Sequence, residues 1–350
     1  MQYPIVAVDL AKNTFEVAIV DSPRATPRFR RLARGQFERF VAKQSKAQFV
    51  LEACTTSHFW GREALRHGHE VRMLPAQHVV AYRRRNKTDR ADTRALLEAN
   101  RAPDIHCVPV KDAQQQAVAQ LHTVREQWVK RRTATINQAR ALLGEHGIRI
   151  PQGAHKARQQ IPLILEDADN GLPDVLRGVI QDLVESISEI DRCIHRIEGE
   201  LRAYQARDAN AQRISELPGV GLITSTAITS CVGDLRLFDK PRQFAAWLGL
   251  TPREHSSGDR RQLGRITKQG NASLRQMIIH GGRSALSAAL RKYRSGTALD
   301  PLEQWAVRTY ERVGFNKAVV AFANKLARRI AALCRDASRY EPETMTPAVA

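Results

Sequence analysis

Two acidic residues follow directly after apolar runs in the first sixth of the chain. Asp9 follows residues 5–8 (IVAV), and Glu52 follows residues 49–51 (FVL). Short apolar runs are typical of buried strands, so pairing of these two strands would bring both carboxylates together. A carboxylate directly after such a run is half buried and needs a partner.

Two further acids, Asp89 and Asp92, lie three residues apart in NKTDRADTRALLEA. This segment is expected to open a helix, on which residues three apart share a face. Converging carboxylates repel one another, and a hard divalent cation such as magnesium (Mg²⁺) relieves the repulsion and bridges phosphate oxygens. The four acids therefore predict a metal site for phosphodiester chemistry. Acids in a first helical turn also favour the helix dipole, which is a purely structural explanation for Asp89 and Asp92.

A second reactive group lies in the polar loop REHSSGDRRQLGRITKQGNASLRQ, which follows the compact run RQFAAWLGLTP. Residues 253–294 contain ten Lys or Arg and two acids, which predicts a phosphate-binding surface. A serine among guanidinium groups could attack a phosphodiester, because these groups stabilise the developing negative charge. The residues alone leave Ser256 and Ser257 almost equally plausible, and most loop serines have no chemical role. The cations expected to contact nucleic acid here are Arg253, Arg260, Arg261, Arg265 and Lys268.

A third signal is the stretch LPGVGLITSTAI at residues 217–228. Gly219 and Gly221 would form a tight turn ahead of an apolar helix, and backbone N–H groups at a helix N-terminus suit a phosphate. The stretch resembles the helix-hairpin-helix element of many DNA-handling proteins. An ordinary glycine-rich helix connection is the alternative.

The elements that must position these residues follow from the apolar pattern. Strands are expected at residues 5–8, 14–20 and 48–51, with helices between and after them, which indicates an α/β domain to about residue 101. Residues 111–147 read as one long helix, and residues 151–173 as a linker or short helices.

The clearest periodicity is an apolar seam that steps by four and three residues: Leu176, Ile180, Leu183, Ile187, Ile190, Ile194, Ile197, Leu201 and Tyr204. It predicts a coiled coil, whose partner is either the 111–147 helix or the same segment of another subunit. Self-association is expected. The predicted domains are 1–107, 108–208 and 209–338, the last mainly helical, followed by a tail at 339–350.

Composition limits the class of protein. The chain has 350 residues, a formal net charge of +19 and 43% hydrophobic residues. Such a charge favours a polyanionic partner, above all nucleic acid, although a basic solubilising surface is an alternative. The five cysteines show no zinc-finger spacing, there is no signal-peptide pattern, and no apolar run reaches the about 18 residues of a membrane span. A soluble cytoplasmic protein is expected.

Several motifs together resemble a known family. They are VAVDLAKNTFEVAI, VLEAC, MLPAQHVVAYRRRNKTDRADTRALLEA, LPGVG, RQFAAWLGLTPREHSSG and LGRITKQGNASLRQ. Across nearly the whole chain the sequence is similar to the DEDD transposases of the insertion sequence 110 family, in particular its 1111-like subgroup.

The resemblance implies an N-terminal RuvC-like, ribonuclease H-type domain whose tetrad maps to Asp9, Glu52, Asp89 and Asp92 and binds Mg²⁺. It implies a coiled coil leading to a transposase domain, in which the serine before a glycine, Ser257, attacks DNA and forms a transient phosphoserine link. The composite site would be assembled from different subunits of an oligomer. A structured noncoding guide RNA (bridge RNA) from the element would pair with donor and target DNA.

The sequence departs from this family in two places. Thr55, Thr56 and Ser57 follow Glu52-Ala53-Cys54, where the subgroup usually has Gly or Ala, and β-branched residues restrict a turn that glycine would permit. Asp259 is an unusual acid beside Ser257 and would act as a base or repel phosphate. Two other functions remain open: a metal-dependent nuclease in which the tetrad activates water, and a non-catalytic nucleic-acid-binding protein.

Overall fold

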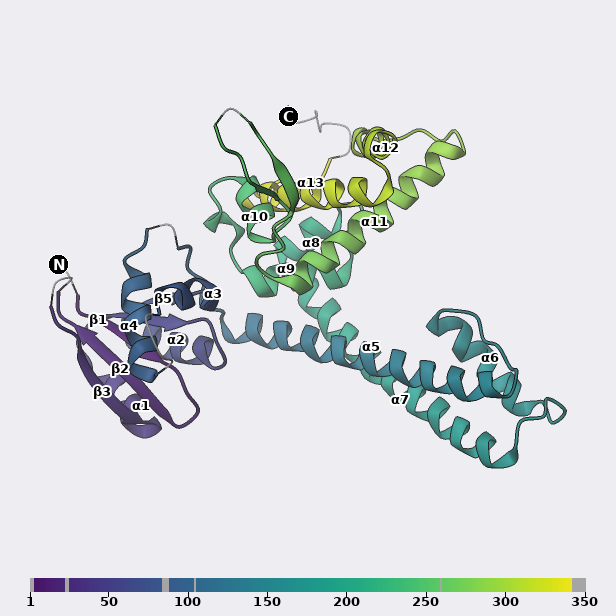
Figure 1. Cartoon of the computed structure of the whole chain (residues 1–350), viewed down its shortest axis with the longest axis horizontal. Coiled ribbons are helices and arrows are strands. Elements are labelled where there is room, and N and C mark those ends of the chain that lie inside the picture. Colours follow the sequence, from purple (N-terminus) through teal and green to yellow (C-terminus); the bar gives the residue numbers. More distant parts are fainter. Residues whose placement is uncertain (1–2, 23–24, 84–87, 104, 259, 342–350) are drawn as a thin grey trace. The chain divides into compact units, whose positions relative to one another are not determined.

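The computed structural model describes residues 3–22, 25–83, 88–103, 105–258 and 260–341. The chain divides into two compact units, unit 1 (Met1–Gln116) and unit 2 (Ala117–Ala350). Unit 1 is a mixed α/β structure around a central sheet, and the described part of unit 2 is helical apart from one β-hairpin (Figure 1). This confirms the predicted α/β N-terminal part and helical C-terminal part. The domain boundaries at 107, 208 and 338 stay predictions.

The elements of unit 1 are, in chain order, β1 (Ile5–Asp9), β2 (Thr14–Val20), β3 (Arg28–Ala33), α1 (Arg34–Lys43), β4 (Gln48–Glu52), α2 (Ser57–Arg66), β5 (Glu70–Leu74), α3 (Ala76–Val79), η1 (Val80–Tyr82) and α4 (Asp89–Asn100). The strand order is β3-β2-β1-β4-β5. β1 pairs antiparallel with β2 and β2 with β3, whereas β1, β4 and β5 run parallel. The three predicted strands are present. β3 and β5 were not predicted.

Each face of this sheet has its own core, because side chains alternate along a strand. Val8 and Leu51 pack with Trp60 of α2 on one face. Ala7 and Val50 pack with Leu96 of α4 on the other. Strand positions two residues beyond Ala7 and Val50 therefore face α4.

The elements of unit 2 are α5 (Ala113–Glu145, which begins in unit 1), α6 (Ala154–Glu166), α7 (Asp174–Gln205), α8 (Ala209–Ser215), α9 (Leu222–Val232), η2 (Leu235–Leu237), α10 (Pro241–Trp247), β6 (Pro252–Glu254), β7 (Leu263–Ile266), α11 (Ala272–Arg294), α12 (Pro301–Val313) and α13 (Phe315–Arg335). The largest core lies among α8 to α13. None of the described helices combines the length and the apolar character that a membrane crossing needs.

The partner of the apolar seam on α7 is α5 of the same chain. The C-terminal part of α5, with Ile136 and Leu143, packs with Ile180 and Ile187. The N-terminal part of α5, with Val118, packs with Leu201 and Tyr204 of α7. Residue numbers thus rise along α5 as they fall along α7, and the two helices form an antiparallel hairpin (Figure 1).

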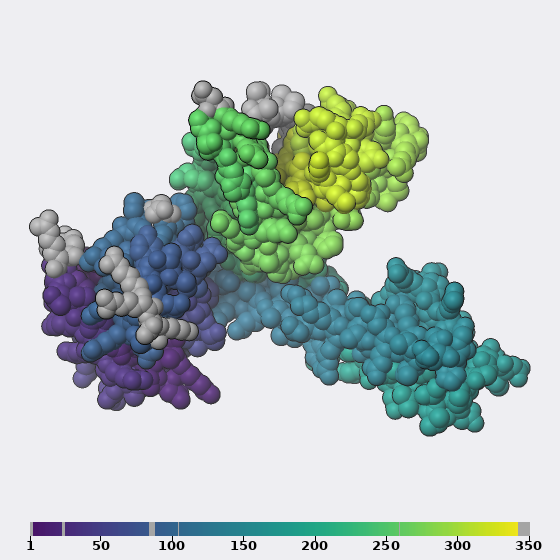
Figure 2. Space-filling view, viewed as in Figure 1, coloured from purple at the N-terminus to yellow at the C-terminus, as the bar shows by residue number. Residues whose placement is uncertain are grey.

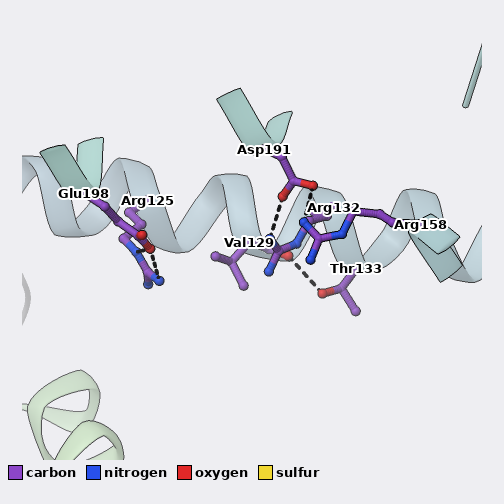
Figure 3. A network of polar contacts seen from close by, with 7 residues as sticks. All are labelled: Arg125, Val129, Arg132, Thr133, Arg158, Asp191 and Glu198. Carbon is purple, nitrogen blue, oxygen red and sulfur yellow. Dashed lines mark hydrogen bonds and ion pairs between the residues drawn. The ribbon is translucent and has the colours of Figure 1, made fainter. Parts of the chain in front are cut away.

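Asp191 is a buried acid at the side of this seam. It accepts hydrogen bonds from Arg132 of α5 at 2.6 Å and from Arg158 of α6 at 2.7 Å. Arg125 of α5 donates to Glu198 of α7 nearby (Figure 3). Two guanidinium groups on one carboxylate tie three helices together and fix their register.

Candidate active site

Asp9 and Glu52 end neighbouring parallel strands. Val8 of β1 is paired with Leu51 of β4, so the next residue on each strand lies at the same edge of the sheet. Both carboxylates project toward the face that α4 covers, by the alternation of the strands. The sequence prediction that strand pairing brings these two acids together is thereby supported at the level of backbone register.

The thiol of Cys54 lies within electrostatic reach of both acids. Partial desolvation, and then the negative charges of Glu52 and Asp9, raise the pKa of this thiol to about 11. Both carboxylates therefore act on the same sulfur atom. A protonated thiol carries no charge of its own at neutral pH, so the local charge here comes from the carboxylates.

Asp89 and Asp92 lie in the first turn of α4, where the hydroxyl of Thr88 accepts a hydrogen bond from the Ala91 N–H and caps the helix. Each of the two acids has an arginine partner. Asp92 lies 3.2 Å from Arg83 Nη1 in a largely shielded pair, and Asp89 lies 3.7 Å from Arg31 of β3 in an exposed one.

Glu16 is an acid on this face that the sequence analysis missed. On β2 it is paired in register with Asp9 of β1 and Arg31 of β3. It is only 8% exposed, and Arg90 of α4 lies 3.6 Å from its carboxylate. A lone acid inside the apolar strand TFEVAIV was the available signal.

The donor chemistry of the acids suits Mg²⁺, which prefers carboxylate oxygens. Three acids of this face, however, are engaged in pairs with arginines. Among the described residues there is no group of three or more His, Cys, Asp or Glu side chains that could hold a metal ion. Asp89 and Asp92 instead have arginine partners, so the four predicted ligands are gathered on one face without being assembled around one point.

The turn after Glu52 contains the departure noted in the sequence. Thr56 adopts a left-handed conformation with φ 72°, which favours glycine and is strained for a β-branched residue. Ser57 stabilises the turn, because its hydroxyl donates to the Cys54 carbonyl at 2.8 Å. The turn therefore forms with threonine in a position that glycine would fill without strain.

The predicted serine loop is a β-hairpin of β6 and β7 rather than an irregular loop. It extends from the helices of unit 2 (Figure 1), and no other segment covers the side of it that the space-filling view shows (Figure 2). Ser256 and Ser257 lie near its tip, where both are exposed. Asp259, the unusual acid, lies outside the described residues.

The two serines differ in what their hydroxyls do. Ser256 Oγ donates to Glu254 at 2.7 Å and accepts from the Gln262 N–H at 3.2 Å, so it ties the two strands together. The hydroxyl of Ser257 has no hydrogen-bond partner among the described residues, although its backbone carbonyl accepts from the Arg260 N–H. Ser257 is thus the serine whose oxygen is available.

The cations predicted to contact nucleic acid are all exposed on or beside this hairpin: Arg253, Arg260, Arg261, Arg265 and Lys268. Arg261 lies 3.5 Å from Glu254, and Arg253 donates to the Thr267 carbonyl. Within the described part of the chain, Arg260, Arg265 and Lys268 have no ion pair. Of these cations, Arg260 lies opposite Ser257 at the tip of the hairpin, whereas Arg265 and Lys268 lie toward its base.

Two glycines allow the base of the hairpin to lie against α10 and its following turn. A Cβ on Gly270 would lie 1.8 Å from the Trp247 carbonyl oxygen, and one on Gly249 would lie 2.3 Å from the Gln269 carbonyl oxygen. Both glycines also have positive φ. The orientation of the hairpin thus depends on close backbone contact that other residues would prevent.

Gly219 and Gly221 occupy the turn between α8 and α9. A Cβ on Gly219 would lie 2.3 Å from the Gly281 carbonyl oxygen of α11, which gives this glycine a packing role. Gly221 is exposed and is the N-cap of α9, with no side-chain cap. Phosphate contact at this turn stays a prediction, and Gly221 is the better placed of the two glycines.

Comparison with known proteins gives consistent matches along the chain. A model of the transposase family IS116/IS110/IS902 matches residues 211–295, and a transposase model named for DEDD and IS110 matches residues 6–148. The chain is 36% identical over 336 residues to the transposase for insertion sequence element IS1111A of Coxiella burnetii, covering 96% of this chain and 91% of the relative.

Two further relatives agree with this. A probable family 20 transposase of Pseudomonas aeruginosa is 35% identical over 338 residues, with coverage of 96% and 98%. The transposase for insertion sequence element IS1328 of Yersinia enterocolitica is 31% identical over 324 residues, with coverage of 93% and 94%.

Proposed function

Because this chain belongs to the IS110 family of insertion sequence transposases, we propose that it cleaves and rejoins DNA strands through a covalent link between Ser257 and a DNA phosphate. Unit 1 would be a RuvC-like, ribonuclease H-type domain, and its central parallel strands ending in Asp9 and Glu52 support this. Ser257 would be the nucleophile of the transposase part.

The observation that carries the proposal is the difference between the two serines. Ser256 has its hydroxyl engaged within the hairpin, whereas Ser257 has a hydroxyl without a partner among the described residues. Arg260 lies opposite it at the hairpin tip, and guanidinium groups stabilise negative charge on a phosphate under attack. The hairpin thus offers one available nucleophile in a positive surface.

This step needs no outside energy source, because one phosphate ester bond forms as another breaks. Ser257 Oγ forms a bond to phosphorus and loses its proton, while the bond from phosphorus to one DNA strand breaks and that strand leaves as a hydroxyl. Rejoining is the reverse, with a DNA hydroxyl attacking the phosphoserine. The acidic residues Asp9, Glu52, Asp89 and Asp92 would hold Mg²⁺ through their carboxylate oxygens, and the ion would supply positive charge to offset that of the phosphate.

We further propose a structured noncoding guide RNA and a homo-oligomer, either a dimer or a tetramer, on the strength of the family resemblance. The net charge of +19 supports binding of two nucleic acids. RNA that copurifies with the protein and maps to the flanks of its gene would support the guide. Random cellular RNA would argue against it.

The proposal is tested by trapping the protein–DNA link on substrates carrying the ends of the element. Wild-type protein should give a covalent adduct that is resistant to denaturant, and Ser257→Ala should give none. Ser256→Ala is the matched control, and it should keep the adduct at a reduced rate, because only a hairpin tie is lost. Full strand cleavage by Ser257→Ala would indicate a nuclease that activates water and would reject the proposal.

A further inference from the structure

The acidic face of unit 1 carries its own counter-ions. Three of its acids each lie close to one arginine: Asp92 with Arg83, Asp89 with Arg31, and Glu16 with Arg90. These arginines come from three different segments, namely the end of η1, strand β3 and helix α4. Guanidinium groups thus neutralise acids that would otherwise repel one another on one face.

The pair of Arg83 and Asp92 is the most shielded of the three. Its side chains are 27% and 17% exposed, whereas those of Arg31 and Asp89 are 69% and 59% exposed. Water screens an exposed ion pair strongly and a shielded one much less. Arg83 is therefore the cation with the greatest effect on the proposed ligand set.

We propose that Arg83 is a built-in substitute for the divalent cation: it holds Asp92 while the site is empty and must release this carboxylate before a metal ion can bind. This rests on the proposed function, since it takes Asp92 as a metal ligand. Arg83 is a positioning residue and has no contact with substrate in this proposal.

Loss of the Arg83 charge should raise the affinity of the site for a metal ion. A guanidinium on Asp92 both occupies a ligand oxygen and repels an arriving divalent cation. Its removal should strengthen cation binding about tenfold, the size expected for one unit charge a few ångströms from a partly hydrated divalent ion. Removal should also lower stability without metal, because Asp92 is left partly buried and without its partner.

The experiment measures binding of Mn²⁺, as the probe ion, to the full-length chain by electron paramagnetic resonance, together with melting with and without Mg²⁺. Arg83→Met keeps the stem of the side chain and removes the charge. It should bind Mn²⁺ about tenfold more tightly, melt at a lower temperature without metal, and gain more from Mg²⁺ than the wild type does. Arg83→Lys keeps the charge and should bind like the wild type.

Arg66→Met is the matched control, because Arg66 has a surface ion pair with Glu63 on α2 and should leave Mn²⁺ affinity unchanged. Unchanged or weaker binding by Arg83→Met, or failure of this variant to fold in both conditions, would overturn the inference. A different result would reject the tetrad itself: no Mn²⁺ binding by wild type or Arg83→Met, or binding that Asp92→Asn leaves unaltered.

Discussion

At the scale of single residues, the position of the hairpin that carries Ser257 depends on a glycine at its base. Gly270 has φ +75°, and its missing Cβ leaves room for the Trp247 carbonyl oxygen. Both features exclude other residues at this position. The direction in which Ser257 is presented therefore depends on a residue with no functional group.

Gly270→Ala should lower the free energy of unfolding by about 3 kcal/mol, from the strain of a left-handed alanine and the clash with backbone. It should also speed tryptic cleavage within residues 253–265. Chemical unfolding followed by circular dichroism, with timed proteolysis, measures both effects.

Gly171→Ala is the control for this change. Gly171 has φ +70° and nothing within 4 Å of a Cβ, so this variant carries the backbone strain alone, about 1–2 kcal/mol. Equal losses in the two variants would show that the contact with Trp247 contributes nothing.

At the scale of elements, the α5–α7 hairpin combines an apolar seam with a polar lock, which is the pair of ionic contacts that Asp191 makes with Arg132 and Arg158. The seam favours any register that keeps apolar residues facing one another. Asp191 distinguishes among these registers, because only one places Arg132 and Arg158 on its two oxygens. Removal of one partner leaves buried charge uncompensated.

Asp191→Asn should lower the stability of unit 2 by about 3 kcal/mol, because two arginines lose a charged partner in a shielded position. Thermal unfolding measures the loss. Glu189→Gln on the same helix removes an exposed pair with Arg192 and should cost less than about 1 kcal/mol. Similar losses in both variants would show that the lock around Asp191 has no special role.

The same lock predicts a dependence on pH. Burial by itself raises the pKa of Asp191, but hydrogen bonds from Arg132 and Arg158 outweigh it and hold the pKa below the ordinary value of 3.8. A depressed carboxyl pKa contributes stability above its unfolded value, and this contribution is lost as the pH falls through the folded value. The stability difference between wild type and Asp191→Asn should therefore shrink below about pH 4, and a constant difference would contradict this.

At the scale of the whole molecule, the net charge of +19 makes nucleic-acid binding depend on salt through counterion release. The total charge does not say which cations contact phosphate. Within the residues that the structure describes, some arginines have acidic partners, whereas Arg260, Arg265 and Lys268 on or beside the β6–β7 hairpin have none, and this difference can be tested.

Changing three unpaired cations to glutamine, namely Arg260, Arg265 and Lys268, should reduce the slope of log binding constant against log salt by about 3. The control triple is Arg192, Arg236 and Arg335, each of which has an acidic partner. It removes the same formal charge and should change the slope far less. Equal changes would mean that binding senses only the total charge.

The sequence by itself determined the class of the two halves, the long helices and the strands that end in Asp9 and Glu52, because apolar periodicity depends only on neighbouring residues. It did not predict β3, whose arginines hide the alternation of an edge strand, or β5. The hairpin of Ser257 was also hidden, because its strands are short, polar and exposed.

The tertiary structure alone decided which groups meet across the chain. In the folded chain α7 packs against α5, Glu16 is paired in register with Asp9, and Asp92 forms an ion pair with Arg83. It also distinguished Ser256 from Ser257 by the hydrogen bonds of one hydroxyl. No periodic pattern in the sequence predicts these contacts, because they join residues from separate elements or depend on the geometry of one turn. They can be identified only from the tertiary structure.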